Sequence, residues 1–377
     1  MKRERILVAM SGGVDSAAAA ALLVEEGHEV VGATLKLWCY GGAEASPRSC
    51  CSLRDIEDAK ASAAALGIRH YVLDEEADFD REVVQPFVDS YLAGETPNPC
   101  VRCNTHLKFG GLIDRARRMG FDAVATGHYA RVTLDADGPR LRRGLDTAKD
   151  QAYVLWGIGR DDLAFSRFPV GDYDKEEIRG LAERAGLNVA QKIESQDICF
   201  VQGESYADFV ESRAAGAEQT RPGPIVDAAG RRIGTHRGVI HYTVGQRRGL
   251  GIAGDHAFYV VRVDSQTNTV VVGSKAELLS REIEVREINW VSCLPPSGPI
   301  RADVKIRYRA VPAPATITPR AGTTAGIHFD DSQRAPAPGQ SAVFYDGDVV
   351  LGGGVIEPTM VAPGPVPVAT ESAPDAS

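Results

Sequence analysis

The feature that most constrains the fold is a glycine-rich turn between a short apolar run and an alanine-rich segment. Residues 5–10, Arg-Ile-Leu-Val-Ala-Met, are typical of a buried strand, and residues 15–26 of a helix that ends at Gly27. The turn between them contains the run Ser11-Gly-Gly-Val-Asp-Ser16. A strand that enters a helix so directly favours an α/β domain, in which helices cross between parallel strands.

The same alternation continues to about residue 130. Further strand-like runs cover 29–37, 69–73 and 122–126, and further helix-like runs cover 53–66, 79–92 and 107–119. We therefore expect residues 1–205 to form an α/β domain with a parallel sheet and helices on both faces. In its second half, Asp174 and Glu177 have capping-box spacing before the apolar-periodic run 178–187, which predicts another helix start.

The sequence pattern changes after about residue 220, from alternating strand-like and helix-like runs to short β-branched runs. Short β-branched runs separated by Gly, Pro, Asn and Asp occur at 256–263, 269–272, 302–308 and 341–345. This spacing predicts a small central β-rich domain over 206–282 and a C-terminal β-barrel over 283–358. Residues 359–377 are rich in Pro, Ala, Ser and Thr, which is typical of a disordered tail.

The glycine-rich turn has the chemistry of a phosphate-binding loop. Gly12 and Gly13 let backbone amides point at an anion, and the following helix N-terminus favours negative charge. Ser11 and Ser16 add hydroxyl donors, and Asp15 suits a magnesium ion that bridges phosphates. The run lacks the Gly-Lys-Ser/Thr ending of a Walker loop and the third glycine of a dinucleotide fingerprint. The alternative interpretation is a tight turn and helix cap without a ligand.

Seven cysteines, an odd number, argue against a disulfide scaffold. Cys103 follows a proline-punctuated loop, 96–99, and lies near the predicted start of a helix at Thr105, where the helix dipole and Arg102 would favour a thiolate. Cys100 and Cys103 form a single C-x-x-C, and no second such pair exists to complete a zinc site. Taken alone, Cys199 is typical of a buried thiol. The remaining thiols have no interpretable context: Cys39, Cys50, Cys51 and Cys293.

Charge and hydropathy exclude some classes of protein. The formal net charge of −9 disfavours a non-specific nucleic-acid coat but leaves room for a local basic surface. Four basic clusters are present, each of which is either a solvated face or an RNA contact: 140–143, 231–232, 247–248 and 305–309. No apolar run approaches the roughly 20 residues of a membrane span, and no signal-peptide pattern opens the chain, so we expect a cytoplasmic protein.

Taken together, the motifs resemble the tRNA-specific 2-thiouridylase family (MnmA) of the ATP pyrophosphatase, or PP-loop, superfamily. The matching motifs are the Ser11–Ser16 run, Thr96-Pro-Asn-Pro99 with Cys103-Asn104, Ala125-Thr-Gly-His-Tyr129, Lys149-Asp-Gln151, Ser195-Gln-Asp-Ile-Cys-Phe200, Thr243-Val-Gly-Gln-Arg-Arg-Gly-Leu-Gly251, Arg307-Tyr-Arg309 and Pro338-Gly-Gln340. They run in order through nearly all of the chain except the tail. The resemblance implies an N-terminal domain like the adenine nucleotide alpha hydrolases, followed by a small β domain and a β-barrel.

The resemblance also implies roles for individual residues. ATP would be held by Ala9, Met10, Ser11, Gly12, Gly13, Val14, Asp15 and Ser16, with Leu35 and Gly127 nearby. Cys103 would be the catalytic nucleophile, and Cys199 would carry persulfide sulfur. The target base would meet Asn98, Pro99 and Cys100. The rest of the tRNA would touch His128, Lys149, Asp150, Gln151, Arg307, Tyr308 and Gln340.

The reaction that the resemblance implies is ATP-dependent thiolation of the wobble uridine of tRNA. Adenylation of O2, with Mg²⁺ on the phosphates, would make that oxygen a leaving group, and the persulfide of Cys199 would deliver sulfur to C2. A Cys103–Cys199 disulfide would resolve the intermediate. A cysteine desulfurase or a sulfur-relay protein would supply the sulfur, and no membrane would take part.

One position departs from the family pattern. Many members carry Asp, a candidate proton-transfer group, where this chain has Cys100, and a thiol is a different acid and base. The substitution creates a set of three thiols, Cys100, Cys103 and Cys199, which could instead hold an iron–sulfur cluster with one position open to sulfide.

Two other functions share part of this pattern. A small-molecule ATP pyrophosphatase would need the Ser11–Ser16 run but neither Cys103 nor Cys199. A tRNA-binding or chaperone module with a vestigial nucleotide site would bind tRNA without forming AMP. The identity of the substrate tRNAs and the oligomeric state have no signal in the sequence.

Overall fold

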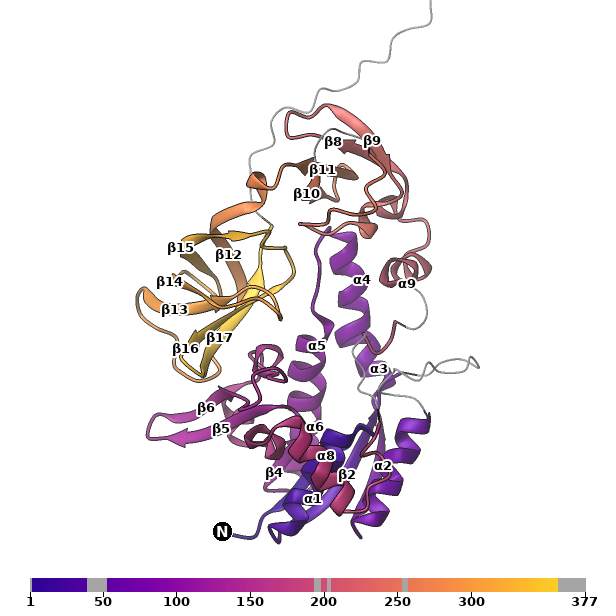
Figure 1. Ribbon diagram of the computed structural model, residues 1–377, viewed down its shortest axis with the longest axis vertical. Helices are drawn as coiled ribbons and strands as arrows, with labels where there is room; N and C mark the ends of the chain where they lie inside the picture. The colour runs from indigo at the N-terminus through magenta and orange to yellow at the C-terminus, as the bar shows by residue number, and fades with distance from the viewer. Residues whose placement is uncertain (1, 39–52, 193–197, 202–204, 253–256, 359–377) are drawn as a thin grey trace, which may run out of the picture.

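The computed structural model describes residues 2–38, 53–192, 198–201, 205–252 and 257–358. Their N-terminal part is built on a five-stranded parallel sheet, with the strand order β3-β2-β1-β4-β7. Its strands are β1 (Arg5–Ala9), β2 (Glu29–Lys36), β3 (Arg69–Asp74), β4 (Ala123–Thr126) and β7 (Ser166–Arg167). Figure 1 labels β2 and β4 of this sheet in its lower half. The chain adds β2 and β3 on one side of β1 and β4 on the other. The carboxyl ends of β1 and β4 therefore flank a topological switch point, where α/β sheets bind ligands.

Helices cover both faces of this sheet because the side chains of β1 alternate between two cores. Ile6 and Val8 pack with the alanine-rich α1 and α2 on one face, whereas Leu7 packs with α6 on the other. The helical segments are α1 (Val14–Glu25), α2 (Leu53–Ala65), α3 (Glu76–Phe79), the π-helical η1 (Asp80–Val84), α4 (Gln85–Leu92), α5 (Pro99–Arg102), the π-helical η2 (Cys103–Gly111), α6 (Leu112–Arg118), η3 (Ala152–Val154), α7 (Arg160–Ala164), η4 (Pro169–Asp172) and α8 (Lys175–Arg184).

The central part of the chain forms a four-stranded sheet with the order β10-β11-β8-β9. Its core includes Ile225, Val260, Val270 and Val272. The preceding helix packs on α4, which rises from the N-terminal domain toward this sheet (Figure 1). The elements are α9 (Tyr206–Arg213), η5 (Glu218–Thr220), β8 (Gly223–Val226), β9 (Arg232–His236), η6 (Val239–His241), β10 (Tyr259–Asp264), β11 (Thr269–Gly273) and η7 (Ala276–Leu278).

The C-terminal strands close into a six-stranded barrel, because β12 pairs with both β15 and β17. Closure leaves no open edge between these strands. The strands are β12 (Leu279–Asn289), β13 (Ile300–Lys305), β14 (Ala313–Pro319), β15 (Ala325–Arg334), β16 (Ser341–Asp346) and β17 (Val349–Ile356). The expected fold class, a parallel α/β domain followed by a β domain and a β-barrel, is confirmed. The exact domain bounds remain a prediction.

One hairpin of the N-terminal part joins the barrel. Strands β5 (Ala130–Asp135) and β6 (Gly138–Arg143) pair with each other, and β6 continues the barrel sheet by pairing with β17. Leu141 on β6 is fully buried, in a core that also contains Val343 and Val350 of the barrel. The α/β domain and the barrel therefore share one hydrophobic core.

The predicted start of the cysteine-bearing helix is wrong. Thr105 was expected to begin it, but helical structure runs from Pro99 through α5, η2 and α6 to Arg118. Proline is favoured at the first helical position because its fixed φ and missing N–H cost nothing there. Within the described part of the chain, no helix is both long and apolar enough to cross a membrane.

Candidate functional site

The Ser11–Ser16 run lies at the switch point as a tight loop between β1 and α1. Gly12 has φ +74°, and a Cβ there would lie 2.2 Å from the backbone oxygen of Asp55, so only glycine fits. The Ser16 hydroxyl accepts a hydrogen bond from the Ser11 amide (3.1 Å) and donates one to the Gly13 carbonyl (3.1 Å). The Ser16 hydroxyl therefore holds the loop in shape from inside.

Two lysines bring positive charge to this loop. Lys175, at the start of α8, donates to Asp15 Oδ1 at 2.7 Å, and the Tyr129 hydroxyl donates to the same oxygen at 2.9 Å. Lys192 donates to the Gly12 carbonyl at 3.0 Å and pairs with Asp55 at 2.7 Å. Sequence reasoning missed both lysines, because they lie far along the chain from the loop. The sequence pattern nearest to Lys175 was the predicted capping box of Asp174 and Glu177, which indicates a helix start and not a phosphate site.

Lys192 keeps its charge in this setting. Burial acts to lower the pKa of Lys192, but hydrogen bonds to Asp55 and Asp58 outweigh burial, and the pKa is raised. An ammonium group that already contacts a loop carbonyl is well placed to offset negative charge on a bound phosphate.

The opposite wall of the loop is formed by the segment after β4. A Cβ on Gly127 would lie 2.5 Å from the Ser16 nitrogen and 2.6 Å from the Asp15 carbonyl carbon. Beside it, the Thr126 hydroxyl and His128 Nδ1 are 2.7 Å apart. Burial, and then the charge of Lys108, lower the pKa of His128 well below 6.5, so the ring is neutral at pH 7. Leu35 is partly buried near the carboxyl end of β2, two strands from β4.

The cysteines lie around the helix that begins at Pro99, and two of them pack in a core cluster that also contains Leu37 just after β2. Cys100 is exposed in the first turn of that helix, and Cys103 is 8% exposed one turn later. The partial positive charge of the helix N-terminus, expected beside Cys103, therefore lies beside Cys100. The guanidinium of Arg102, which was also expected to favour a thiolate at Cys103, donates to the Glu82 carbonyl at 2.8 Å. Cys103 and the partly buried Cys199 pack in one aromatic cluster that includes Phe79, Phe87 and Phe200.

The three thiols do not form a metal site in the described part of the chain. No group of three or more His, Cys, Asp or Glu side chains is arranged there to hold a metal ion. The residues present therefore do not fit an iron–sulfur cluster on Cys100, Cys103 and Cys199. Cys39, Cys50, Cys51 and residues 195–197 lie outside the described residues. Burial raises the pKa of the Cys293 thiol, which donates to the Leu351 carbonyl at 3.7 Å and has a structural role.

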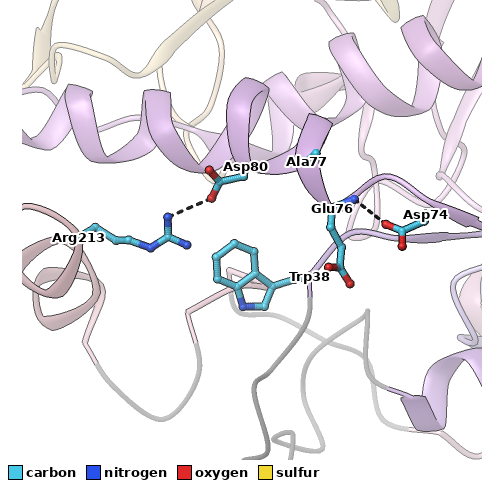
Figure 2. Close-up of a pocket in the computed structure, with 6 residues that line it drawn as sticks. All are labelled: Trp38, Asp74, Glu76, Ala77, Asp80 and Arg213. Atoms are coloured by element: carbon cyan, nitrogen blue, oxygen red, sulfur yellow. Dashed lines mark hydrogen bonds and ion pairs between the residues drawn. The ribbon is translucent and has the colours of Figure 1, made fainter.

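A cavity of about 560 Å³ opens beside the aromatic cluster (Figure 2). Trp38 lines it, with ring centroids 6.4 Å from Phe200 and 6.2 Å from Phe209. Arg213 lies 5.0 Å from the Trp38 ring and pairs with Asp80 at 3.0 Å. The lining residues are Trp38, Asp74, Glu76, Ala77, Asp80 and Arg213. Sequence reasoning missed this cavity, because its residues come from separate segments and form no motif.

The predicted tRNA-contact residues gather where the α/β domain meets the barrel. Tyr308, 41% exposed, donates its hydroxyl to the Asp150 carbonyl at 3.1 Å, which places the predicted contacts at 149–151 beside Arg307. Burial raises the pKa of Asp150, although the amides of Ala152 and Gly144 donate to its carboxylate. The Gln151 side chain accepts from the Tyr129 amide at 2.9 Å. Asp150 and Gln151 thus shape this surface from within.

A second cavity, of about 330 Å³, lies where all three parts of the chain meet. Gln340 closes one side by donating to the Thr96 carbonyl at 2.7 Å. Arg307 donates to the Ala335 carbonyl, and burial followed by the nearby charge of Arg334 lowers the pKa of Arg307. The lining residues are Thr96, Thr243, Val244, Gly245, Arg307, Ala337 and Gln340. Asn98 and Pro99 lie just beyond Thr96 at the start of the cysteine helix.

The basic cluster 140–143 has structural partners. Arg140 pairs with Asp135 and Asp137, and Arg142 pairs with Asp348 at 2.7 Å. Arg143 lies 4.1 Å from the Tyr345 ring. Of the two interpretations offered for this cluster, these contacts favour a structural role in the β5–β6 hairpin.

Comparison with known proteins links these features to tRNA modification. Residues 4–203 match the family described as tRNA methyl transferase HUP domain, 208–274 the tRNA methyl transferase PRC-barrel domain, and 280–356 the aminomethyltransferase beta-barrel domain. A protein from Moorella thermoacetica is 48% identical over 93% of this chain and 99% of its own length. One from Geobacter metallireducens is 48% identical over 95% and 98%. Both relatives are called tRNA-specific 2-thiouridylase MnmA.

Similarity to solved structures is weaker. A 4-thiouridine synthetase, solved with RNA and bound ATP, is 17% identical and covers 52% of this chain and 45% of its own. Its TM-score is 0.35.

Proposed function

The chain belongs to the tRNA-specific 2-thiouridylase family, and from that premise we propose how its residues divide the work of the reaction. The protein is an ATP-dependent tRNA-uridine 2-sulfurtransferase. It adenylates the wobble uridine of tRNA at O2 and then replaces that oxygen with sulfur, and the products are 2-thiouridine, AMP and pyrophosphate.

The ATP phosphates bind at the Ser11–Ser16 loop. The observation that carries this assignment is the glycine-walled loop at the switch point, with Lys175 and Lys192 on its rim. Backbone amides of the loop and the N-terminus of α1 point at the phosphates, and the lysines offset their charge. Asp15 is the hard oxygen ligand that would hold Mg²⁺. Leu35 and Gly127 lie beside the rest of the nucleotide.

Sulfur transfer uses the two cysteines of the aromatic cluster. The terminal sulfur of a Cys199 persulfide attacks C2 of the adenylated uridine, and AMP leaves with the former O2. The Cys103 thiolate then attacks the Cys199 sulfur, which releases the thiocarbonyl and forms a Cys103–Cys199 disulfide. Two equivalents of an external thiol, or one dithiol, reduce this disulfide before the next turnover. The packing of both cysteines in one cluster supports this division of roles.

The target uridine leaves its stack and lies beside Asn98, Pro99 and Cys100 at the start of the cysteine helix. The rest of the tRNA contacts the surface between the α/β domain and the barrel through Lys149, Arg307, Tyr308 and Gln340. Asp150 and Gln151 support that surface from within, and His128 contacts the tRNA from the segment after β4. Because His128 is neutral, it offers a hydrogen bond or a stacking surface rather than a charge.

The sulfur comes from a cysteine desulfurase or from a relay protein that carries a persulfide. No step passes through an iron–sulfur cluster, since the described thiols do not fit one. We place the enzyme in the cytoplasm, where its tRNA substrate is found, and we propose domain bounds of 1–205, 206–282 and 283–358, with a tail at 359–377.

A thiolation assay tests these roles. The protein is incubated with tRNA, ATP, Mg²⁺ and a persulfide donor, the RNA is digested, and 2-thiouridine and AMP are measured by mass spectrometry. We expect product from the wild type and from Cys293→Ser, a control at a structural thiol, and none from Cys103→Ser or Cys199→Ser. Full 2-thiouridine formation by either of the last two variants would disprove the assigned cysteine role. No 2-thiouridine from a wild-type protein that binds tRNA would instead favour a small-molecule ATP pyrophosphatase.

A further inference from the structure

The segment just before the cysteine helix, residues 93–96, is held from one side by the central domain. Ser265 Oγ donates to the Ala93 carbonyl at 3.0 Å, and Thr96 Oγ1 donates to Thr243 Oγ1 at 3.2 Å. Gly94 has φ +79°, and a Cβ there would lie 3.1 Å from Val263 Cγ1. The segment therefore lies directly on the central sheet.

The barrel holds the same segment from the other side. The Thr96 amide donates to the Pro338 carbonyl at 2.8 Å, and Gln340 Nε2 donates to the Thr96 carbonyl at 2.7 Å. The guanidinium of Arg286, on β12, pairs with the mostly buried carboxylate of Glu95 at 2.8 Å. Both backbone hydrogen-bonding groups of Thr96 are thus satisfied by the barrel.

A short and stiff stretch of backbone connects segment 93–96 to the cysteines. Pro97 and Pro99 fix two of the three backbone φ angles between Thr96 and Cys100, and Pro99 begins the helix that carries Cys100 and Cys103. A rigid shift of segment 93–96 therefore moves Cys103 with it. A displacement of about 1 Å can cost a reaction as much as 100-fold in rate.

We infer that Glu95, Arg286 and Gln340 are positioning residues that couple tRNA docking on the barrel to the placement of Cys103. They act through segment 93–96 and touch no reacting atom. Gln340, predicted from the sequence as a tRNA contact, gains this second role through its bond to Thr96. The inference rests on the proposed catalytic role of Cys103.

The test uses Arg286→Gln, which removes the ion pair between Arg286 of the barrel and Glu95 of segment 93–96. Single-turnover thiolation by the full-length protein, loaded with persulfide, is measured at saturating tRNA, together with the Kd for tRNA and the Tm. We expect a rate about tenfold below wild type with the tRNA Kd within about twofold. The charge-swapped double variant Glu95→Arg/Arg286→Glu should recover part of the rate. Arg301→Gln breaks an exposed ion pair with Asp330 on the outer surface of the barrel and should leave the rate unchanged.

A wild-type rate in Arg286→Gln, or a defect that disappears as tRNA is raised, would overturn the inference. If Arg286→Gln does not fold, Glu95→Gln, which keeps the side-chain size, is judged by the same two criteria. Cys103→Ser is run in the same assay. Activity in that variant would refute the role of Cys103 itself, whereas an inactive Cys103→Ser beside a fully active Arg286→Gln would refute the coupling alone.

Discussion

Gly127 lies directly against the first turn of α1, where a Cβ would come within 2.5 Å of the Ser16 backbone nitrogen. The contact sets the distance between the segment after β4 and the first turn of α1. Because the opposing atoms are backbone rather than flexible side chain, they cannot move aside without displacing the helix N-terminus. The phosphate loop and the segment after β4 therefore form one unit.

The first prediction follows from this contact. Gly127→Ala should push the start of α1 away from β4, destabilise the protein by roughly 1–3 kcal/mol and raise the KM for ATP at least tenfold. Chemical denaturation and steady-state AMP formation measure the two effects. Gly298→Ala is the matched control, because a Cβ there meets no heavy atom within 4 Å. Equal stability and equal KM in the two variants would show that the contact does not shape the site.

The second prediction concerns the ion pair between Lys175 and Asp15. Lys175→Gln removes a positive charge beside the phosphates and the hydrogen bond that orients the Asp15 carboxylate, so the KM for ATP should rise about tenfold. The tRNA affinity should stay unchanged, since the pair lies at the loop. Lys175→Arg keeps the charge and should restore part of the ATP affinity. An unchanged KM in Lys175→Gln would place the phosphates away from Asp15.

Local patterns in the sequence predicted the α/β domain well. The expected strand at 29–37 is observed as Glu29–Lys36 and the helix at 53–66 as Leu53–Ala65. The capping box of Asp174 and Glu177 is present with both of its hydrogen bonds. These features depend on residues close together in the chain, where apolar period and capping chemistry act directly.

Contacts between distant segments could not be predicted from the sequence. The ion pair of Lys175 with Asp15 spans 160 residues, and the Gln340–Thr96 bond spans 244. The β5–β6 hairpin was interpreted as a basic cluster, because its arginines are conspicuous while their acidic partner Asp348 lies on the barrel. The resemblance supplied candidate residues, but only the fold showed which of them bond to each other.

The third prediction is a pH dependence of stability at His128. In the folded state the pKa of His128 is well below 6.5, the value for an unfolded chain, so the unfolded state binds the proton first as pH falls. Stability contributed by the neutral ring is present above pH 6.5 and is lost progressively below it. Between pH 7.5 and 5.5, His128→Gln should lose about 1 kcal/mol less unfolding free energy than wild type in urea denaturation. Equal losses of unfolding free energy in His128→Gln and wild type would mean that the pKa of His128 is not lowered by folding.

The fourth prediction concerns the charge of Arg307. Its guanidinium is half-buried beside the exposed ring of Tyr308, at the second cavity. If it meets a tRNA phosphate there, Arg307→Ala should weaken tRNA binding and reduce the slope of log K against log salt by about one. Because Arg307 also bonds to the Ala335 carbonyl, the variant's Tm must be measured to separate lost charge from a loosened barrel.

Arg301→Ala provides the matched control for this measurement. Arg301 lies on the same barrel, but its charge is already neutralised by Asp330 at 2.6 Å, so its removal should leave the salt slope unchanged. Arg307→Lys keeps the charge without the planar fork and should retain the slope while losing some affinity. If Arg307→Ala binds more weakly at every salt concentration with an unchanged slope, Arg307 supports the surface through Ala335 and makes no phosphate contact.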